Sequence, residues 1–170
     1  MKNFILVTLI ITLLVSCQTN NEQQVSKSVN WGNRAASETD FEGYLHGKSY
    51  LPVYSHIYHI QEHKAFDLTI TISIRNISAT DSIYILNADY YNTKGDKIRQ
   101  YLEKPAYISP METVEIIIAE KDKEGGSGAN FVFDWAVKNP QNPPLIEAVM
   151  ISTLDQQGIS FTTRAVQVAE

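Results

Sequence analysis

The amino-acid sequence of 170 residues predicts an all-β fold, an antiparallel immunoglobulin-like two-sheet sandwich of about seven to eight strands. Three observations lead to this class. Apolar and polar residues alternate with a period of two in the clearest segments. Short segments of this kind recur at regular intervals, with turn residues between them and no convincing helix among them. The same spacing is compatible with a barrel, but the sandwich is favoured.

The clearest predicted strand runs from Phe66 to Arg75. Its alternate positions form an apolar and a polar set, namely Phe66, Leu68, Ile70, Ile72 and Ile74 against Asp67, Thr69, Thr71, Ser73 and Arg75. Strict alternation indicates a strand with one buried face, and the β-branched residues suit a pleated sheet.

Seven further segments are predicted as strands: 52–60, 83–91, 97–102, 113–119, 131–137, 145–154 and 158–164. Between the second and third of these lies the turn 92–96, in which Gly95 can adopt a positive φ. This turn predicts a hairpin between the strands on either side of it.

Residues 1–16 are predicted to be a lipoprotein signal peptide. Lys2 precedes an apolar run over residues 4–15, which is shorter than the roughly 20 residues of a membrane-spanning helix. Residues 14–17, Leu-Val-Ser-Cys, resemble the bacterial lipobox, in which a small residue precedes the cysteine that receives a diacylglyceryl group.

Cys17 is the only cysteine in the chain, so an intramolecular disulfide is excluded and lipidation explains its position. Two or three acyl chains would anchor the protein to a membrane stably. The alternative is an ordinary signal peptide with a chance cysteine. Gln18 stands where an Asp favours inner-membrane retention, so the expected localisation is the cell envelope, anchored in the outer membrane.

Residues 17–47 are predicted to form the lipidated cysteine and a flexible tether, and residues 48–170 the β-sandwich domain. The tether is rich in Gln, Asn, Ser, Glu and Gly. Trp31, Phe41 and Tyr44 are exceptions in this polar segment and are candidates for docking on the domain.

The net charge is −5 at pH 7, with no cluster of Lys and Arg. Nucleic acid is therefore not an expected partner. No cofactor is predicted. Asp89, Asn92 and Asp96 lie near a predicted strand end, but they lack the spacing of an EF-hand calcium loop.

All four histidines, His46, His56, His59 and His63, lie within one short stretch. Imidazole is a common ligand for zinc and copper, so His56, His59 and His63 are candidate metal ligands. On one strand His56 and His59 would point to opposite faces and could not bind the same ion directly. Surface or hydrogen-bonded histidines are therefore the favoured interpretation, with no metal site predicted.

Tyr54, His56 and Tyr58 would share one face of the predicted strand 52–60. Rings with polar tips suit a ligand or partner surface, which would also include Ser127 and Asn130. The same face could instead pack beneath the neighbouring sheet or the tether, and that structural interpretation is favoured.

The segment 125–129, Gly-Gly-Ser-Gly-Ala, invites comparison with a phosphate-binding loop or a nucleophile elbow. Both motifs require a helix directly after the loop. Here Asn130 and a predicted strand follow, and Ala129 interrupts the Gly-x-Ser-x-Gly pattern. The prediction is a flexible connection between strands.

Several segments together resemble a bacterial family catalogued as domain of unknown function 3124. They are 51–58 (LPVYSHIY), 73–76 (SIRN), 89–91 (DYY), 101–105 (YLEKP), 125–131 (GGSGANF), 147–150 (EAVM) and 158–162 (GISFT). The resemblance extends from about Tyr50 to Arg164. It implies a small exported protein, often a lipoprotein, and brings no activity, cofactor or catalytic residue.

The favoured functional hypothesis is a membrane-anchored binding or structural module of the cell envelope. It would recognise an envelope protein or a glycan through a sheet face or a loop end. Two alternatives remain: a zinc- or copper-handling lipoprotein that uses the His46–His63 region, and a hydrolase, without a recognisable motif, built around the histidines and Ser127.

Overall fold

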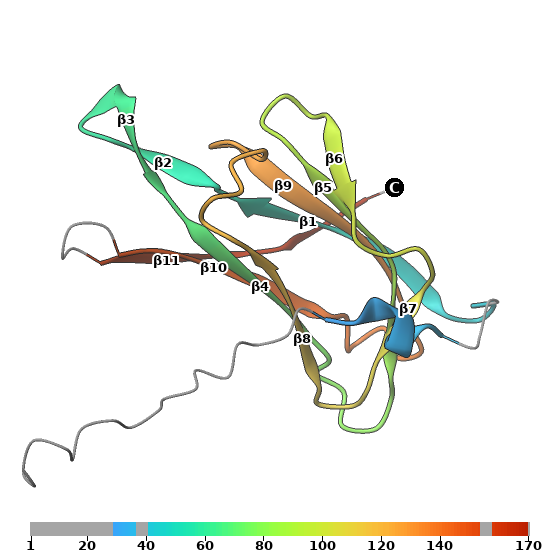
Figure 1. The fold of residues 1–170 in the computed structure, drawn as a ribbon. Helices are drawn as coiled ribbons and strands as arrows, with labels where there is room; N and C mark the ends of the chain where they lie inside the picture. Colours follow the sequence, from blue (N-terminus) through green and yellow to red (C-terminus); the bar gives the residue numbers. More distant parts are fainter. Residues whose placement is uncertain (1–28, 37–40, 154–157, 170) are drawn as a thin grey trace, which may run out of the picture.

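A computed structural model describes residues 29–36, 41–153 and 158–169. In this part of the chain, the secondary structure consists of twelve β-strands and one short 3-10 helix, η1 (Trp31–Arg34). All strand pairs are antiparallel, and they form a six-stranded sheet, a four-stranded sheet and a two-stranded hairpin (Figure 1). The predicted all-β sandwich is confirmed.

The six-stranded sheet has the order β12-β1-β9-β5-β6, and β7 also pairs with β5. Its strands are β1 (Leu45–Val53), β5 (Ile83–Tyr91), β6 (Lys97–Gln100), β7 (Ala106–Ile108), β9 (Ala129–Val137) and β12 (Val166–Val168). The four-stranded sheet has the order β11-β10-β4-β8. It consists of β4 (Thr69–Arg75), β8 (Thr113–Ile118), β10 (Leu145–Ser152) and β11 (Ile159–Arg164).

The core lies between the inner faces of these two sheets. Leu68, Ile70, Ile72 and Ile74 are fully buried, as their alternation predicts. Opposite them, β9 contributes two stacked rings, Phe131 and Phe133, and the buried Trp135. The Trp135 indole N–H donates to the Ser49 hydroxyl at 2.9 Å, so the largest core side chain is also satisfied as a donor.

The predicted strand 52–60 is wrong as a single element. The chain leaves the six-stranded sheet after Val53 and begins the hairpin strand β2 (His56–His59), which pairs with β3 (Gln61–Asp67). Ser55 causes the break because its backbone bonds elsewhere: its N–H donates to the Gly126 carbonyl, and its carbonyl accepts from the Leu68 N–H. The hairpin extends beyond the sandwich in Figure 1.

A segment before the sandwich packs against it. Residues 29–36, here called the strap, include η1 and reach β7, where Ala35 forms a bridge with Ala106 and the Ala36 N–H donates to the Pro105 carbonyl at 2.8 Å. Trp31 is partly buried against the core. Phe41 is buried and packs against the rings of Tyr44 and Tyr84. The three aromatic residues singled out from the tether are thus in contact with the domain.

The sandwich begins at Leu45, three positions before the boundary expected from the sequence. Residues 1–28, which include Cys17, lie outside the described residues. Among the residues that are described, no helix has the length and apolar character needed to cross a membrane.

Candidate binding site

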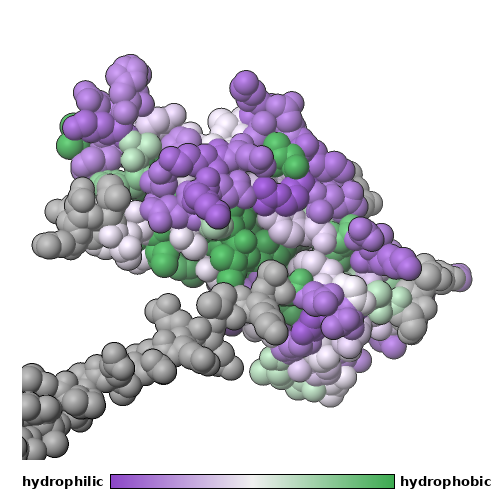
Figure 2. Space-filling view, in the orientation of Figure 1, coloured by the Kyte–Doolittle hydropathy of each residue, from purple (hydrophilic) through white to green (hydrophobic). Residues whose placement is uncertain are grey.

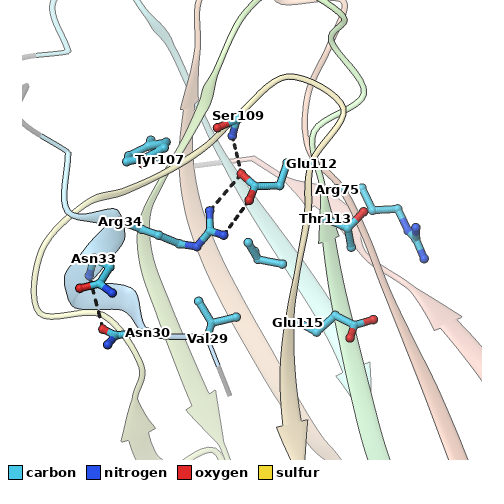
Figure 3. A pocket seen from close by; sticks show the side chains of 11 residues that line it. Val29, Asn30, Asn33, Arg34, Arg75, Tyr107, Ser109, Glu112, Thr113 and Glu115 are labelled. Atoms are coloured by element: carbon cyan, nitrogen blue, oxygen red, sulfur yellow. Dashed lines mark hydrogen bonds and ion pairs between the residues drawn. The ribbon is translucent and has the colours of Figure 1, made fainter. Parts of the chain in front are cut away.

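An open groove of about 690 Å³ lies between the strap and the edge strand β8. On one side it is lined by Val29, Asn30, Asn33 and Arg34, and on the other by Arg75, Tyr107, Ser109 and the run from Glu112 to Glu115. Figure 3 shows Arg34 extending from η1 across the groove toward Glu112. We call this cavity the strap groove.

A bidentate ion pair spans one end of the strap groove. The two terminal nitrogens of Arg34 donate to the two carboxylate oxygens of Glu112 at 3.0 and 2.6 Å, and the Ser109 N–H donates to the same carboxylate at 2.9 Å. These hydrogen bonds, donated by Arg34 and accepted by Glu112, lower the pKa of Glu112 and raise the pKa of Arg34. This pair fixes the strap to the start of β8.

The free edge of β8 forms the wall of the strap groove opposite η1. On its other edge, β8 pairs with β4 through the register Ile74↔Val114 and Ile72↔Ile116. The Asn76 N–H donates to the Glu112 carbonyl, which places a hydrogen-bonded pair at Asn76 and Glu112. Hydrogen-bonded and non-bonded pairs alternate in an antiparallel ladder. The backbone N–H and C=O groups of Val114 and Ile116 therefore bond to β4.

It follows that the backbone N–H and C=O groups of Thr113, Glu115 and Ile117 point away from β4. No strand in the described part of the chain pairs with this edge. The sequence of β8, Thr-Val-Glu-Ile-Ile-Ile, is mostly β-branched and contains neither the Pro nor the Lys that commonly blocks an exposed edge. The strand is therefore well suited to accept another strand.

Apolar surface continues from this edge onto the outer face of the four-stranded sheet. Ile117, Val149 and Ile151 are each about 40% exposed. The register places Ile117 and Val149 on either side of Thr71. Figure 2 shows hydrophobic surface bordered by hydrophilic surface over the region where Figure 1 places β4 and β10.

The candidate surface predicted around Tyr54 is divided by the break at Ser55. Tyr54 packs edge-on against Phe161 of β11 at 5.7 Å between ring centroids, whereas His56 and Tyr58 contact each other on the hairpin at 5.6 Å. The prediction that all three share one strand face is therefore wrong. Tyr58 is 60% exposed, near the hairpin tip.

The histidines are dispersed over three strands. His46 on β1 lies 3.4 Å from the Phe41 carbonyl, His59 packs on the Phe66 ring, and His63 on β3 lies beside Glu62. Across the described ranges, no group of three or more His, Cys, Asp or Glu side chains is arranged to hold a metal ion. Asp134, an acid that a hydrolase built around Ser127 and the histidines could use, pairs instead with Lys48.

The glycine segment before β9 is held in place by hydrogen bonds. The Gly125 carbonyl accepts from the backbone and hydroxyl of Thr93, and the Gly126 carbonyl accepts from the Ser55 N–H. The Gly128 N–H donates to the Thr93 hydroxyl. Ser127 lies within this loop, and Asn130 follows on β9 opposite Pro52 and Tyr91.

The same loop closes over a buried polar group that we call the Tyr90 cluster: Ser55, Tyr90 and Gly125. The hydroxyls of Ser55 and Tyr90 lie 3.1 Å apart, and both residues are fully buried. A Cβ on Gly125 would overlap the Tyr90 hydroxyl, so only glycine fits there. Burial raises the pKa of Tyr90. This cluster is closed to ligands and joins the hairpin base, β5 and the loop.

Sequence reasoning missed the strap groove because its walls come from segments that lie far apart in the chain. Arg34 stands in a segment predicted to be tether, and Glu112 stands in a turn. A single arginine in an otherwise polar, acidic segment was the available signal, and one residue of that kind does not identify a partner.

The fold is an antiparallel β-sandwich with an added hairpin and an open groove at one sheet edge. The chain belongs to the family described as protein of unknown function DUF3124, whose model matches residues 46–168. The family resemblance predicted from the sequence is thus confirmed. No curated protein and no solved structure is significantly similar to the chain.

Proposed function

We propose that this protein is a lipid-anchored lipoprotein of the cell envelope that binds an extended segment of another envelope protein along the free edge of β8. The observation that carries the binding role is the set of outward-pointing backbone groups at Thr113, Glu115 and Ile117, beside the strap groove. The anchor is supported by the lipobox-like sequence that ends at the lone Cys17.

An extended polypeptide matches this edge better than a small molecule does. Alternating N–H and C=O groups at strand spacing are complemented by the backbone of an added strand. Each such hydrogen bond contributes about 1 kcal/mol net, so side chains must supply the selectivity. Ile117 on the outer face, 40% exposed, offers an apolar contact to one side of an added strand.

The charges on the groove walls also favour a polypeptide. Arg34 and Arg75 bring two positive charges, and Glu112 and Glu115 bring two negative charges. Such a balanced rim selects neither a strongly acidic nor a strongly basic ligand. It favours a segment that carries polar or mixed charged side chains.

Chain length restricts where the partner can lie. Val29, at the groove, follows Cys17 by twelve residues. A fully extended chain spans at most about 3.6 Å per residue, so the groove stays within roughly 43 Å of the lipidated cysteine in any conformation. The partner segment would therefore lie close to the membrane surface.

Replacing Glu115 with Pro tests the proposed strand addition. The substitution removes an N–H that points away from β4, so the sheet remains intact while the edge loses a donor. Glu115→Ala is the matched control because it removes the side chain but keeps the N–H. A photo-crosslinking amino acid at Ile117 in the lipidated protein should capture an envelope protein in the wild type and in Glu115→Ala.

In Glu115→Pro we expect this cross-link to fall at least tenfold while the melting temperature changes little. Equal cross-linking in the Pro and Ala variants would contradict strand addition. Ile116→Pro removes an N–H that bonds to β4, and should unfold the sheet.

Mass spectrometry tests the anchor separately: the mature protein should begin with an acylated Cys17, and a bare Cys17 or a retained leader would refute lipidation.

A further inference from the structure

Two loops at one end of the sandwich are held together by hydrogen bonds. They are residues 76–82, between β4 and β5, and residues 109–112, between β7 and β8. We call them the Asn76 platform, because the amide of the buried Asn76 donates to three carbonyls, those of Asp81, Ile108 and Ser109. Figure 1 shows both loops at the end of the sandwich opposite the hairpin β2–β3. The platform is therefore a fixed surface.

The Asn76 platform presents two apolar side chains to solvent. Ile77 is 46% exposed and Met111 is 69% exposed. The Met111 N–H donates at 3.0 Å to the carbonyl of Ser78, the residue after Ile77, so the two apolar residues stand on adjacent backbone segments. A single exposed apolar residue is common on a protein surface, but two neighbouring ones on a fixed surface indicate a contact.

The backbone of Met111 is strained. Among the described residues other than glycine, only Met111 and Ile60, at the tip of the hairpin, have a positive φ. The left-handed region is crowded for a Cβ and is entered most readily by Gly and Asn. A polar Asn would therefore suit residue 111 better, both for the backbone and for contact with water. An exposed apolar side chain at such a position indicates a role outside the fold.

The two ends of the sandwich differ in charge. The platform contains no Lys or Arg, and its two carboxylates, Asp81 and Glu112, both accept hydrogen bonds from neighbouring side chains. The opposite end includes the run 120–124, in which every residue is charged, and Lys123 of this run pairs with Asp67 of the hairpin. In Figure 2 the hairpin end is mostly purple, and the opposite end includes pale-green and white surface. Since charged groups resist transfer out of water, the platform suits contact with lipid better than the hairpin end does.

Chain length also favours the platform as the end that meets the membrane. Glu115, in the strap groove, follows Met111 by four residues, which is about 13 Å at the rise of a strand. From the partner of Glu115 in β4 to Ile60 at the hairpin tip, the chain runs thirteen residues, or roughly 40 Å. Val29, in the same groove, lies at most about 43 Å from Cys17. A bilayer that holds Cys17 can therefore meet the platform well within this limit, whereas contact at the hairpin tip would need nearly all of it.

We propose that the Asn76 platform contacts the surface of the bilayer that holds the lipid anchor, with Ile77 and Met111 entering its interfacial region. This inference rests on the lipid anchor proposed above, but not on strand addition at β8. The anchor keeps the domain at a high effective concentration near lipid, so two apolar side chains suffice for the contact, although they would not hold an unanchored protein. The contact orients the molecule, with the hairpin directed away from the membrane.

Fluorescence quenching tests this contact in the mature lipidated protein, held in phosphatidylcholine nanodiscs. Cys17 is the only cysteine and its sulfur is blocked by lipid, so Ala79→Cys supplies a single free thiol on the platform for a fluorescent label. Lipids with a nitroxide near the headgroup end of the acyl chain should quench this label at least twofold, relative to lipids without a nitroxide.

A matched pair of substitutions shows whether the apolar side chains make the contact. In labelled protein that also carries Met111→Asn, we expect less than half of the quenching, while the fold is retained because Asn accepts a positive φ. Ile60→Asn is the control, since it makes the same kind of change at the other exposed apolar residue with a positive φ, at the opposite end of the molecule. It should leave the quenching unchanged.

Absence of quenching at residue 79, in protein whose Cys17 is acylated by mass spectrometry, would overturn the proposal and leave the anchor intact. Equal quenching with and without Met111→Asn would also overturn it, because the label would then be near lipid without contact through the apolar side chains. So would stronger quenching of a label at Gln61→Cys on the hairpin, since the opposite end would then face the bilayer. A bare Cys17 would remove the anchor and this contact together, whereas the cross-link at Ile117 tests strand addition in every case.

Discussion

The Tyr90 cluster and the Arg34–Glu112 pair are both polar connections between distant segments, but they differ in their contact with solvent. Ser55 and Tyr90 are fully buried, whereas the side chains of Arg34 and Glu112 are 26% and 30% exposed. A buried polar pair loses its water on folding and must be matched within the protein. A partly exposed pair keeps access to water and to other ligands.

This difference separates structural groups from candidate binding groups. The closed cluster occurs where the hairpin base, β5 and the glycine loop meet, and a change there should alter stability. The open pair lies at a groove beside an unpaired strand edge, and a change there should alter the strap and its ligands more than the fold. Three variants that differ in expected effect test this contrast.

Gly125→Ala should have the largest effect on stability. Its Cβ would overlap the Tyr90 hydroxyl and lie 2.8 Å from the Ser55 hydroxyl, in a site with no free space. Overpacking of this kind costs about 1–3 kcal/mol, and we expect the upper end because two buried polar atoms must move. Urea unfolding measures the loss. Gly158→Ala is the control, because a Cβ added there meets nothing within 4 Å. It should change the free energy of unfolding little.

Tyr90→Phe should have an intermediate effect. It leaves the buried Ser55 hydroxyl without its partner, which costs about 1–3 kcal/mol. In the double variant Ser55→Ala/Tyr90→Phe both polar groups are removed, so part of the stability should return. If the double variant is as unstable as the sum of the single variants, the two hydroxyls are not coupled.

The pH dependence of Tyr90→Phe gives a second measurement. Burial raises the pKa of Tyr90 above its ordinary value of 10.0, so the folded protein holds this proton more tightly than the unfolded chain. The raised pKa of Tyr90 therefore contributes to the free energy of unfolding. This contribution is complete below pH 10 and is lost as the pH rises through the pKa of Tyr90 in the folded protein. The wild type should therefore lose more stability than Tyr90→Phe above pH 10. Tyr101, whose pKa is also raised, leaves a residual loss in the variant.

The comparison also shows what a linear sequence can reveal. Alternation in 66–75 and 131–137 identifies the inward-facing residues correctly, because a strand with one buried face follows a local rule. The break at Ser55 follows no local rule, since its backbone bonds to Gly126 and Leu68. The bulge in β5, where Ile85 pairs with Trp135 and Asn87 with Asp134, follows no local rule either, because an extra residue is defined only by the partner strand.

The candidate sites were harder to predict for the same reason. The strap groove combines residues from the segment before the sandwich with residues of β8, and the polar side chains around Asn87 come from four strands. The sequence places Asp89 close to Asn92 and Asp96. In the structure Asn92 and Asp96 bond to each other within the turn, while Asp89 bonds across the sheet to Asn87 and Lys97.

Glu112→Gln should have the smallest effect on stability, at most about 1 kcal/mol at pH 7, because the ion pair with Arg34 is partly exposed and screened by water. Arg34 lowers the pKa of Glu112 below its ordinary value of 4.5. The contribution of the ion pair to the free energy of unfolding is therefore complete above pH 4.5. It is lost as the pH falls through the pKa of Glu112 in the folded protein. The stabilities of wild type and variant should converge in acid.

Hydrogen exchange at the Ala36 amide measures the strap directly, since this N–H donates to the Pro105 carbonyl only while the strap is docked. Exchange should be faster in Glu112→Gln than in wild type at pH 7, although global stability hardly changes. Glu147→Gln removes a looser pair with Arg75, 3.9 Å apart and more exposed, and should leave Ala36 unaffected. Equal Ala36 exchange in all three proteins would mean that apolar contacts of Trp31, rather than the ion pair, hold the strap beside β8.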